Sequence, residues 1–404
     1  MRRSPFLCIA LGAALAVCLS SVSFAGNAPA WKRTMRSAAR GLPMSVELRY
    51  DGEVLFRRDA KEGRPPASVQ KLLLSMAMFD LDGSDHQIKT ALAAKPFTGN
   101  VLRGNLWVLG KGDPSVSSKA GSGRRDFPTR LGLFVKRIRS EGITRVTGSV
   151  AASKGYFSRD WDAPGWRPSF QKEEVALPTA LTIDGNSRNG RFIRQPERIL
   201  ARKLTQRLRK KGVRVEGKSK VGRPPQGVTG FAVVKSAPLW VLARGMNKIS
   251  NNFFAEVLGK RLGARVFDAP GTIGKGARAV ESFARSQGVS LRAFDSSGLS
   301  FANRVSPRSL VRLLDYATEQ PWWRALRRGL PKGGEGTLVD RLEDVPLRAK
   351  TGTLNGVSSL AGWVWMDRVG DWAEFAIMSR GLSKERAVQA EDKIVRIANG
   401  RARP

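Results

Sequence analysis

The feature that most constrains the fold is a pair of strand-forming segments near opposite ends of the chain. Near the start, apolar residues alternate over residues 44–56 on both sides of Asp51-Gly52, which predicts a β-hairpin with a tight turn. Near the end, residues 357–366 and 372–378 form two more strand patterns that are joined by a polar turn. We therefore expect one antiparallel sheet, flanked by helices, that is built from both ends of the chain.

Between these ends the sequence changes character twice, which predicts an insertion. A buried helical pattern begins near Ser68, and short strand patterns with Gly-, Pro- and Ser-rich turns follow it. We predict a first part over residues 26–88, a mainly β inserted region over 89–235, and a second part over 236–404. The second part opens with a long helical pattern at 239–262, which polar residues interrupt, and closes with a helix that is capped by Ser383 and ends at Gly400. The fold class is mixed α/β.

The first 25 residues have the layout of a secretory signal peptide. Arg2 and Arg3 precede an apolar run that extends to Leu19, and small residues follow up to Ala25. We predict cleavage after Ala25, with an uncleaved anchor or a lipoprotein signal at Cys18 as the alternatives. The signal predicts export across the inner membrane into the periplasm or cell envelope.

The counts of histidine and cysteine limit the chemistry that the chain can perform. The only histidine is His86, and the two cysteines, Cys8 and Cys18, lie inside the signal peptide. These counts exclude a histidine-rich zinc site, a four-thiolate finger and an iron–sulfur site, so we expect no metal and no cofactor. A Ser-His-Asp triad would need His86, which we interpret as a surface residue. The general base of an enzyme with this sequence is therefore expected to be Lys, Asp or Glu.

Three short motifs carry residues from which an active site could be built. In the Ser-Val-Gln-Lys motif at 68–71, helical spacing places Lys71 beside the Ser68 hydroxyl, whose proton a neutral lysine can take. Three leucines follow and bury this helix, so a lysine there needs a reason. The Ser-Asn-Asn motif at 250–252 and the Lys-Thr-Gly-Thr motif at 350–353 are the other two. Taken singly, each motif is explained equally well as helix surface, turn or strand edge.

Taken together in this order, the motifs resemble the active-site signature of serine penicillin-binding proteins and class A β-lactamases. Longer stretches are similar to the class C low-molecular-mass penicillin-binding proteins, the D-Ala-D-Ala carboxypeptidase/endopeptidase family. These stretches are residues 66–71, 110–115, 246–252, 295–300, 303–307, 336–338 and 348–362. The long separation between Ser68 and Ser250 also resembles this family, which carries inserted domains, more than it resembles class A β-lactamases.

The resemblance implies a penicillin-binding/β-lactamase-like transpeptidase fold and a serine-type D-Ala-D-Ala carboxypeptidase, with endopeptidase activity as a second outcome of the same chemistry. It implies that Ser68 forms the acyl-enzyme and that Lys71, whose pKa burial and the charge of Lys350 would lower, is the base. The other residues that it implies are Ser250 and Lys350 for catalysis and Asn252, Thr351, Gly352 and Thr353 for substrate binding, with the amides of Ser68 and Thr353 as the oxyanion hole.

Two alternatives come from other functional classes. A β-lactamase or esterase of the same fold would use the same motifs, but the chain has no convincing Glu-x-x-Leu-Asn pattern for fast deacylation. The net charge of +36 would suit a basic cell-envelope binding protein, with residues 202–223 as the candidate patch. We expect peptidoglycan peptides and β-lactams as partners, electrostatic association with an anionic cell wall or membrane surface, and no nucleic acid. The sequence does not fix the oligomeric state.

Overall fold

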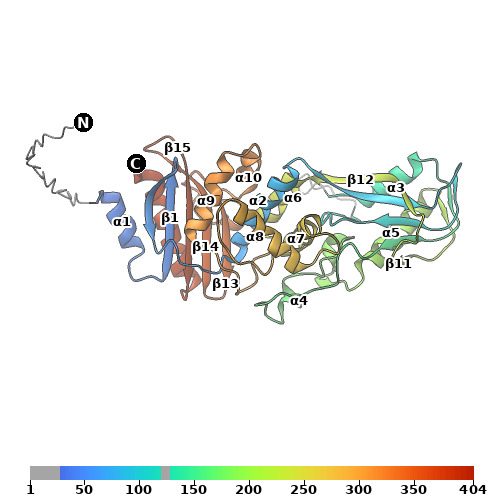
Figure 1. Cartoon of the computed structure of the whole chain (residues 1–404), viewed down its shortest axis with the longest axis horizontal. Coiled ribbons are helices and arrows are strands. Elements are labelled where there is room, and N and C mark those ends of the chain that lie inside the picture. Colours follow the sequence, from blue (N-terminus) through green and yellow to red (C-terminus); the bar gives the residue numbers. More distant parts are fainter. Residues whose placement is uncertain (1–27, 120–127) are drawn as a thin grey trace, which may run out of the picture.

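The two ends of the chain meet in one five-stranded antiparallel sheet, with strand order β13-β14-β15-β1-β2 (Figure 1). The structure is a computed structural model that describes residues 28–119 and 128–404, so the predicted signal peptide lies outside the described residues. The first hairpin pairs with the last strand, with Leu48 opposite Phe375. The strands are β1 (Met44–Tyr50), β2 (Glu53–Arg58), β13 (Leu347–Leu354), β14 (Val357–Met366) and β15 (Asp371–Arg380). The predicted sheet from both chain ends is confirmed.

Helices cover both faces of this sheet, because the central strand β14 is apolar on both sides. Leu360 and Val364 pack toward α1 (Ala30–Ala38) and α11 (Lys384–Arg401). Ala361 and Trp363 pack on the other face, against a cluster that α2 (Gln70–Asp82) supplies with leucines and methionines. The same face is covered by α6 (Leu239–Lys248), α7 (Asn252–Val266), α8 (Ile273–Ser286), α9 (Pro307–Thr318) and α10 (Trp323–Gly329). Side chains that alternate along a strand thus build two separate cores. No helix of the described part of the chain is long and apolar enough to cross a membrane.

The helical pattern predicted over residues 239–262 is two helices with a sharp break between them. α6 ends at Lys248 and α7 begins at Asn252. Ser250 lies in the break with a φ of 56°, and the side chain of Asn251 caps α7 by accepting the amide hydrogen of Phe254 at 3.0 Å. The polar residues that interrupt the pattern are therefore the ones that end one helix and start the next.

The predicted end of the last helix is wrong. Ser383 caps α11 as predicted, but the helix passes through Gly400 and ends at Arg401. Gly400 does not adopt the left-handed conformation that stops many helices. Ala402, the residue after the end of α11, is fully buried in the core. The helix therefore continues past Gly400 until Ala402 can pack there.

The inserted region leaves and rejoins the core on two long paired strands, β3 (Gln87–Ala94) and β12 (Thr229–Pro238). They belong to a five-stranded sheet of order β11-β7-β5-β3-β12, with a three-stranded sheet of order β10-β6-β4 beyond it. These strands include β4 (Val101–Leu102), β5 (Leu106–Leu109), β6 (Arg145–Val146), β7 (Val150–Ser153), β10 (Arg214–Val215) and β11 (Lys220–Gly222). Besides the expected strands, the region holds α3 (Leu131–Ser140), α4 (Phe170–Glu173) and α5 (Pro196–Lys210).

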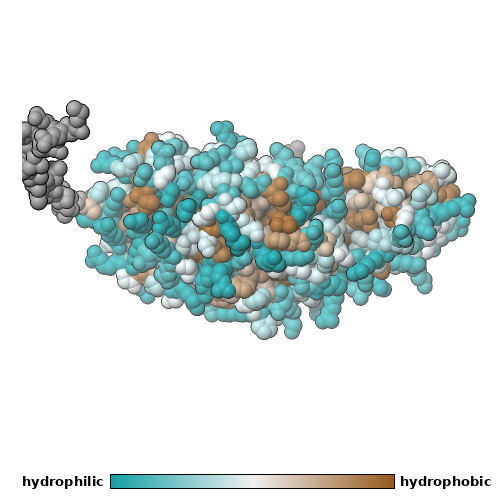
Figure 2. Space-filling view, in the orientation of Figure 1, coloured by the Kyte–Doolittle hydropathy of each residue, from teal (hydrophilic) through white to brown (hydrophobic). Residues whose placement is uncertain are grey.

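The inserted region extends the molecule to one side, so that α3 and α5 lie at the end opposite to the terminal sheet (Figure 1). Leu200, Leu204 and Leu208 are fully buried, so α5 packs one apolar face onto this region as its sequence predicts. Figure 2 shows that the face of the molecule in view is mostly hydrophilic, with small separate apolar areas.

Candidate active site

Ser68 and Lys71 lie side by side where a short turn becomes a long helix. The 3₁₀ turn Ala67–Val69 leads directly into α2, so Lys71 stands in the first turn of this helix. The Nζ atom of Lys71 lies 2.9 Å from the Oγ atom of Ser68, and the lysine side chain is fully buried. The spacing of the motif therefore places a buried amine within hydrogen-bond reach of a hydroxyl, which suits general-base activation of a serine.

Two further elements hold the amine of Lys71. Its Nζ atom lies 2.7 Å from Oδ1 of Asn252, at the start of α7, and 2.5 Å from the carbonyl oxygen of Ser297. Asn252 turns its amide nitrogen toward Glu174 of the inserted region, at 3.1 Å from a carboxylate oxygen. The amine of Lys71 is thus held by three segments that are far apart in the sequence, those of Ser68, Asn252 and Ser297.

Ser250 and Lys350 form a second serine–lysine pair. The Nζ atom of Lys350, on β13, lies 3.0 Å from Oγ of Ser250, in the break between α6 and α7. Lys350 also donates to the carbonyl oxygen of Thr351 at 2.8 Å and is fully buried. We refer to Ser68, Lys71, Ser250, Asn252 and Lys350 together as the active-site cluster.

Burial is the main cause of a low pKa for both lysines, and nearby charges then act on the two in opposite directions. Burial lowers the pKa of Lys71 to about 8, and the negative charges of Asp295, Glu256 and Glu174 act in the opposite direction. Burial lowers the pKa of Lys350 well below its usual range, and the positive charge of Lys71 lowers it further. The sequence led us to expect that burial and the positive charge of Lys350 both lower the pKa of Lys71; in the structure burial lowers it, as expected, and the charges that act on it are those of carboxylates, which raise it.

Gly352 lets β13 pass directly against the turn that carries Ser68. A Cβ atom at this position would lie 2.2 Å from Oγ of Ser359, 2.5 Å from the carbonyl oxygen of Pro66 and 3.0 Å from the amide nitrogen of Ser68. Ser359 itself donates to the carbonyl oxygen of Pro66 at 2.6 Å. The backbone of β13 at Gly352 therefore packs directly against the backbone of the turn at residues 66–68, and only glycine fits at this position.

The two threonines of the motif face different surroundings. The hydroxyl of Thr351 lies 2.6 Å from that of Thr337, and Thr353 is exposed on the same strand beside the cluster. These positions suit contact with a substrate that lies along β13. Among the described residues, no group of histidine, cysteine or carboxylate side chains could hold a metal ion.

The most important residues that the sequence reasoning missed are Glu256 and Ser297. Glu256 is fully buried on α7 and accepts the amide hydrogens of Ser296 and Ser297 at 3.1 and 2.7 Å. Burial, followed by the charge of Asp295, raises the pKa of Glu256 to about 8. The sequence does contain a signal for Glu256, because it is a carboxylate among the apolar residues of α7. A buried carboxylate needs a buried hydrogen-bond partner.

The stretch from Asp295 to Ser300, which is similar to the family, forms a turn that the inserted region contacts. Asp295 accepts the amide hydrogens of Gly298 and Ser300 at 3.0 and 2.8 Å. Trp166, from the inserted region, donates its indole hydrogen to the same carboxylate at 2.7 Å. Trp166 therefore lies near the active-site cluster. Trp322, in contrast, is buried in the core beneath the terminal sheet.

His86 is half-buried, where the sequence led us to expect a surface residue. Its Nε2 atom lies 2.9 Å from a guanidinium nitrogen of Arg261, and burial together with this cation lowers the pKa of His86. Among the contacts of the described residues, His86 has none with the active-site cluster.

Comparison with known proteins assigns this geometry to a family. The model of the D-Ala-D-Ala carboxypeptidase 3 (S13) family matches residues 43–195 and 181–400. The chain is 31% identical over 351 residues to a carboxypeptidase of Mycobacterium tuberculosis, with 81% of this chain and 74% of the relative covered. It is 26% identical over 440 residues to the D-alanyl-D-alanine carboxypeptidase of an Actinomadura species, with 86% and 79% covered.

The fold is similar to that of solved penicillin-binding proteins. Penicillin binding protein 4 from Haemophilus influenzae matches with a TM-score of 0.74 and 22% identity, over 89% of this chain and 98% of that chain. A predatory peptidoglycan endopeptidase from Bdellovibrio bacteriovorus matches with a TM-score of 0.53 and 15% identity, over 90% and 94%. The predicted penicillin-binding fold class is confirmed.

Proposed function

This chain belongs to the D-Ala-D-Ala carboxypeptidase 3 (S13) family, and from that premise we propose that it cleaves the bond between two D-alanines of peptidoglycan stem peptides through an acyl-enzyme on Ser68. Membership makes it a serine peptidase of the class C low-molecular-mass penicillin-binding type. The observation that supports the assignment of Ser68 is its 2.9 Å separation from the buried amine of Lys71. A buried, neutral lysine can do the work that histidine does in a triad.

Acylation can be written with every proton accounted for. Neutral Lys71 takes the Ser68 proton as Oγ attacks the carbonyl carbon of the penultimate D-alanine. The peptide bond then breaks, and protonated Lys71 gives this proton, relayed by Ser250, to the leaving amine of the terminal D-alanine, so that Lys71 is neutral again; Ser250 itself hydrogen-bonds Lys350. A water molecule later gives one proton to neutral Lys71 as it attacks the acyl carbon, and Lys71 returns that proton to Oγ of Ser68 when the acyl bond breaks.

Substrate binding falls to residues around this path. Oδ1 of Asn252 is held by Lys71, so its amide nitrogen, which faces Glu174, is the part that can donate to a substrate carbonyl. Thr351 and Thr353 suit the terminal carboxylate, and Gly352 keeps β13 close to Ser68. The amides of Ser68 and Thr353 would stabilise the oxyanion, for which one donor is typically worth about 3 kcal/mol.

The first test is covalent labelling with a fluorescent penicillin, which carries a strained amide that mimics the substrate. Native protein should be labelled, and Ser68→Ala should not be, because the acyl acceptor is gone. Undiminished labelling of the variant would contradict the assignment of Ser68. Ser75→Ala is a matched control on the same helix, since the Ser75 hydroxyl hydrogen-bonds the backbone of Lys71 rather than its amine.

We further propose that carboxypeptidase activity dominates over endopeptidase activity and that the enzyme works in the periplasm or cell envelope. The relatives named as carboxypeptidases support the first point, and the signal-like residues 1–25 support the second. Digestion of purified cell wall, read by mass, separates the two activities. Loss of one D-alanine per stem peptide is expected, and separated cross-links without that loss would contradict the proposal. Cell fractionation tests the location.

A further inference from the structure

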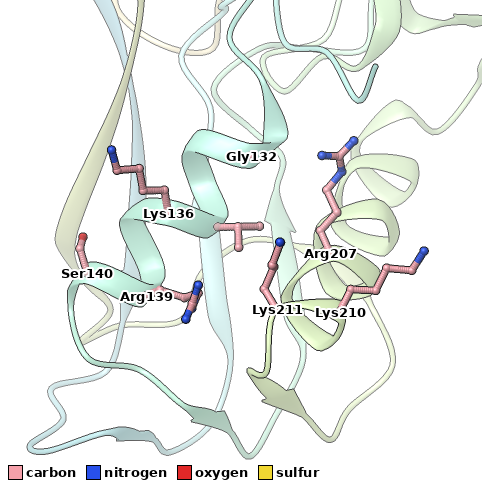
Figure 3. A pocket seen from close by; sticks show the side chains of 8 residues that line it. Gly132, Lys136, Arg139, Ser140, Arg207, Lys210 and Lys211 are labelled. Atoms are coloured by element: carbon pink, nitrogen blue, oxygen red, sulfur yellow. The ribbon is translucent and has the colours of Figure 1, made fainter. Parts of the chain in front are cut away.

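A recessed basic surface with a cavity of about 660 Å³ lies between α3 and α5. Figure 1 shows these two helices at the end of the molecule opposite to the terminal sheet. The recess is lined by residues of α3, of α5 and by the residue that follows α5, namely Gly132, Val135, Lys136, Arg139, Ser140, Arg207, Lys210 and Lys211, of which five are cationic. Figure 3 shows Arg139 and Lys211 extending into the space between the helices. We call this surface the α3/α5 groove.

The positive charge of the groove is not neutralised within the described chain. Of the described residues, no carboxylate forms an ion pair with Lys136, Arg139, Lys210 or Lys211. Glu141, which follows α3, pairs with Arg137 at 3.3 Å, and Glu216 pairs with Arg145 at 2.7 Å. Like charges are thus held close together without compensation, which an anion would relieve.

Helix capping does not account for so many cations. Both helices end at the groove, at Ser140 and Lys210, and basic residues in a last turn favour a helix C-terminus. Each helix end carries roughly half a negative charge, so two ends offset about one positive charge. Arg207 also donates to the carbonyl oxygen of Ser118, so the cations of the groove that remain available to an external anion are Lys136, Arg139, Lys210 and Lys211.

The shape of the groove favours a chain over a single ion. Its volume is in the range of pockets that hold whole ligands, about 300–1,000 Å³, and it is much larger than one phosphate needs. At Gly132 a Cβ atom would have no neighbour within 4 Å, so nothing in the packing requires glycine at this helical position. The missing side chain leaves the groove open.

We propose that the α3/α5 groove binds a polymer of the cell envelope that carries repeated phosphodiester groups. Arginine presents a fork of donors that matches a phosphate, and lysine adds mobile point charges. Arg139 and Lys211 extend into the space between the helices, while Lys136 and Lys210 point outward on either side of it, so the positive charge is spread over a width that one anionic chain with several charged groups could cross (Figure 3). This binding would hold the enzyme near its wall substrate; it rests on the proposed function only in placing the protein in the envelope.

The test measures binding of the purified protein to poly(glycerol phosphate) by titration at low and at physiological salt. The charge-reversal variant Arg139→Glu/Lys211→Glu should bind about tenfold more weakly. The matched control Lys384→Glu/Lys393→Glu changes the net charge equally on the exposed face of α11 and should stay within about twofold of native. If both variants lost the same affinity for poly(glycerol phosphate), the binding would come from the overall net charge, and the proposal that the α3/α5 groove binds the polymer would be wrong.

A second variant separates shape from charge. Gly132→Phe adds no charge but fills open space in the groove, so it should weaken binding at least fivefold. Thermal unfolding of each variant shows whether it is folded. Unchanged binding by folded Gly132→Phe would overturn the proposal.

Two further probes test the identity of the polymer. Vesicles of phosphatidylglycerol and a single-stranded oligonucleotide carry the same phosphodiester chemistry in other molecules. Groove-dependent binding that is tighter to either of these than to poly(glycerol phosphate) would overturn the assignment to a wall polymer. Because the titrations need no acylation, Ser68→Ala should bind the polymer like the native protein, so this test can fail or succeed independently of the proposed peptidase function.

Discussion

The amine of Lys71 lies 2.5 Å from the carbonyl oxygen of Ser297, and the amide of that same residue is held by a buried carboxylate. Glu256 accepts the amide hydrogen of Ser297 at 2.7 Å, while its other oxygen, Oε2, has no hydrogen-bond partner among the described residues. Glu256 does not touch the reacting atoms. Glu256 instead holds the turn that contains Ser297, and the carbonyl oxygen of Ser297 holds the amine of Lys71.

Substitution of Glu256 should therefore change catalysis in a way that depends on the replacement. In Glu256→Gln an acceptor oxygen remains for the amides of Ser296 and Ser297, but the carboxylate charge, which raises the pKa of Lys71 where Glu256 is ionised, is lost. Because the pKa of Glu256 is itself raised to about 8, this charge is present mainly above that pH, so its loss should increase the neutral fraction of Lys71 and the rate of acylation near and above pH 8 and leave the rate at pH 6 nearly unchanged. The measurement is the second-order rate of acylation by a penicillin across pH.

Glu256→Ala is the companion variant, because it removes the acceptor as well as the charge. Two buried amides lose their partner, at a cost of about 1–3 kcal/mol each, and acylation should fall about tenfold. If the Ala variant acylates like the Gln variant at every pH, Glu256 acts only through its charge, and the positioning role is wrong.

The acylation rate of the native enzyme should rise with pH through about 8. Burial lowers the pKa of Lys71 to about 8, and the base must be neutral to accept a proton. The rate should rise with pH because a higher pH increases the neutral fraction of Lys71, which is about one tenth at pH 7. A rate that is flat between pH 6 and 9, or falls there, would argue against Lys71 as the base.

Removal of the amine gives a more direct test of the same role. Lys71→Ala should lower the rate of acylation at least a hundredfold, the usual contribution of a positioned general base. The folded state should survive, because a buried amine is replaced by an apolar group. Near-native acylation by a folded Lys71→Ala protein would exclude the lysine as base.

Local patterns predicted much of this architecture. Alternation of apolar residues predicted the hairpin at 44–56 and the strands at 357–366 and 372–378, and helical spacing predicted that Lys71 lies beside Ser68. The polar interruption near Ser250 marked the helix break. In each case the signal lies within a few residues of the feature that it predicts.

Contacts between distant segments could not be predicted in this way. The carbonyl of Ser297 reaches Lys71, and Glu174 reaches Asn252, only because the whole fold brings these segments together. The predicted end of α11 was wrong for a related reason. Burial of Ala402 overrides the local tendency of Gly400 to end a helix. Tertiary packing, and not local propensity, decides such positions.

The last prediction concerns the close passage of β13 against Ser68. Gly352→Ala adds a Cβ atom that would lie 2.2 Å from Oγ of Ser359 and 2.5 Å from the carbonyl oxygen of Pro66, so β13 must move away from the turn. The amide of Thr353, on β13, would then move away from the amide of Ser68, and loss of an oxyanion donor typically lowers the rate about a hundredfold or more. Gly245→Ala, on α6, is the matched control, because its Cβ has no neighbour within 4 Å and alanine favours a helix. We expect penicillin acylation to be lost in Gly352→Ala and retained in Gly245→Ala, with thermal unfolding recorded for both. Native-like acylation by Gly352→Ala would show that the approach of β13 to Ser68 is not needed for the chemistry.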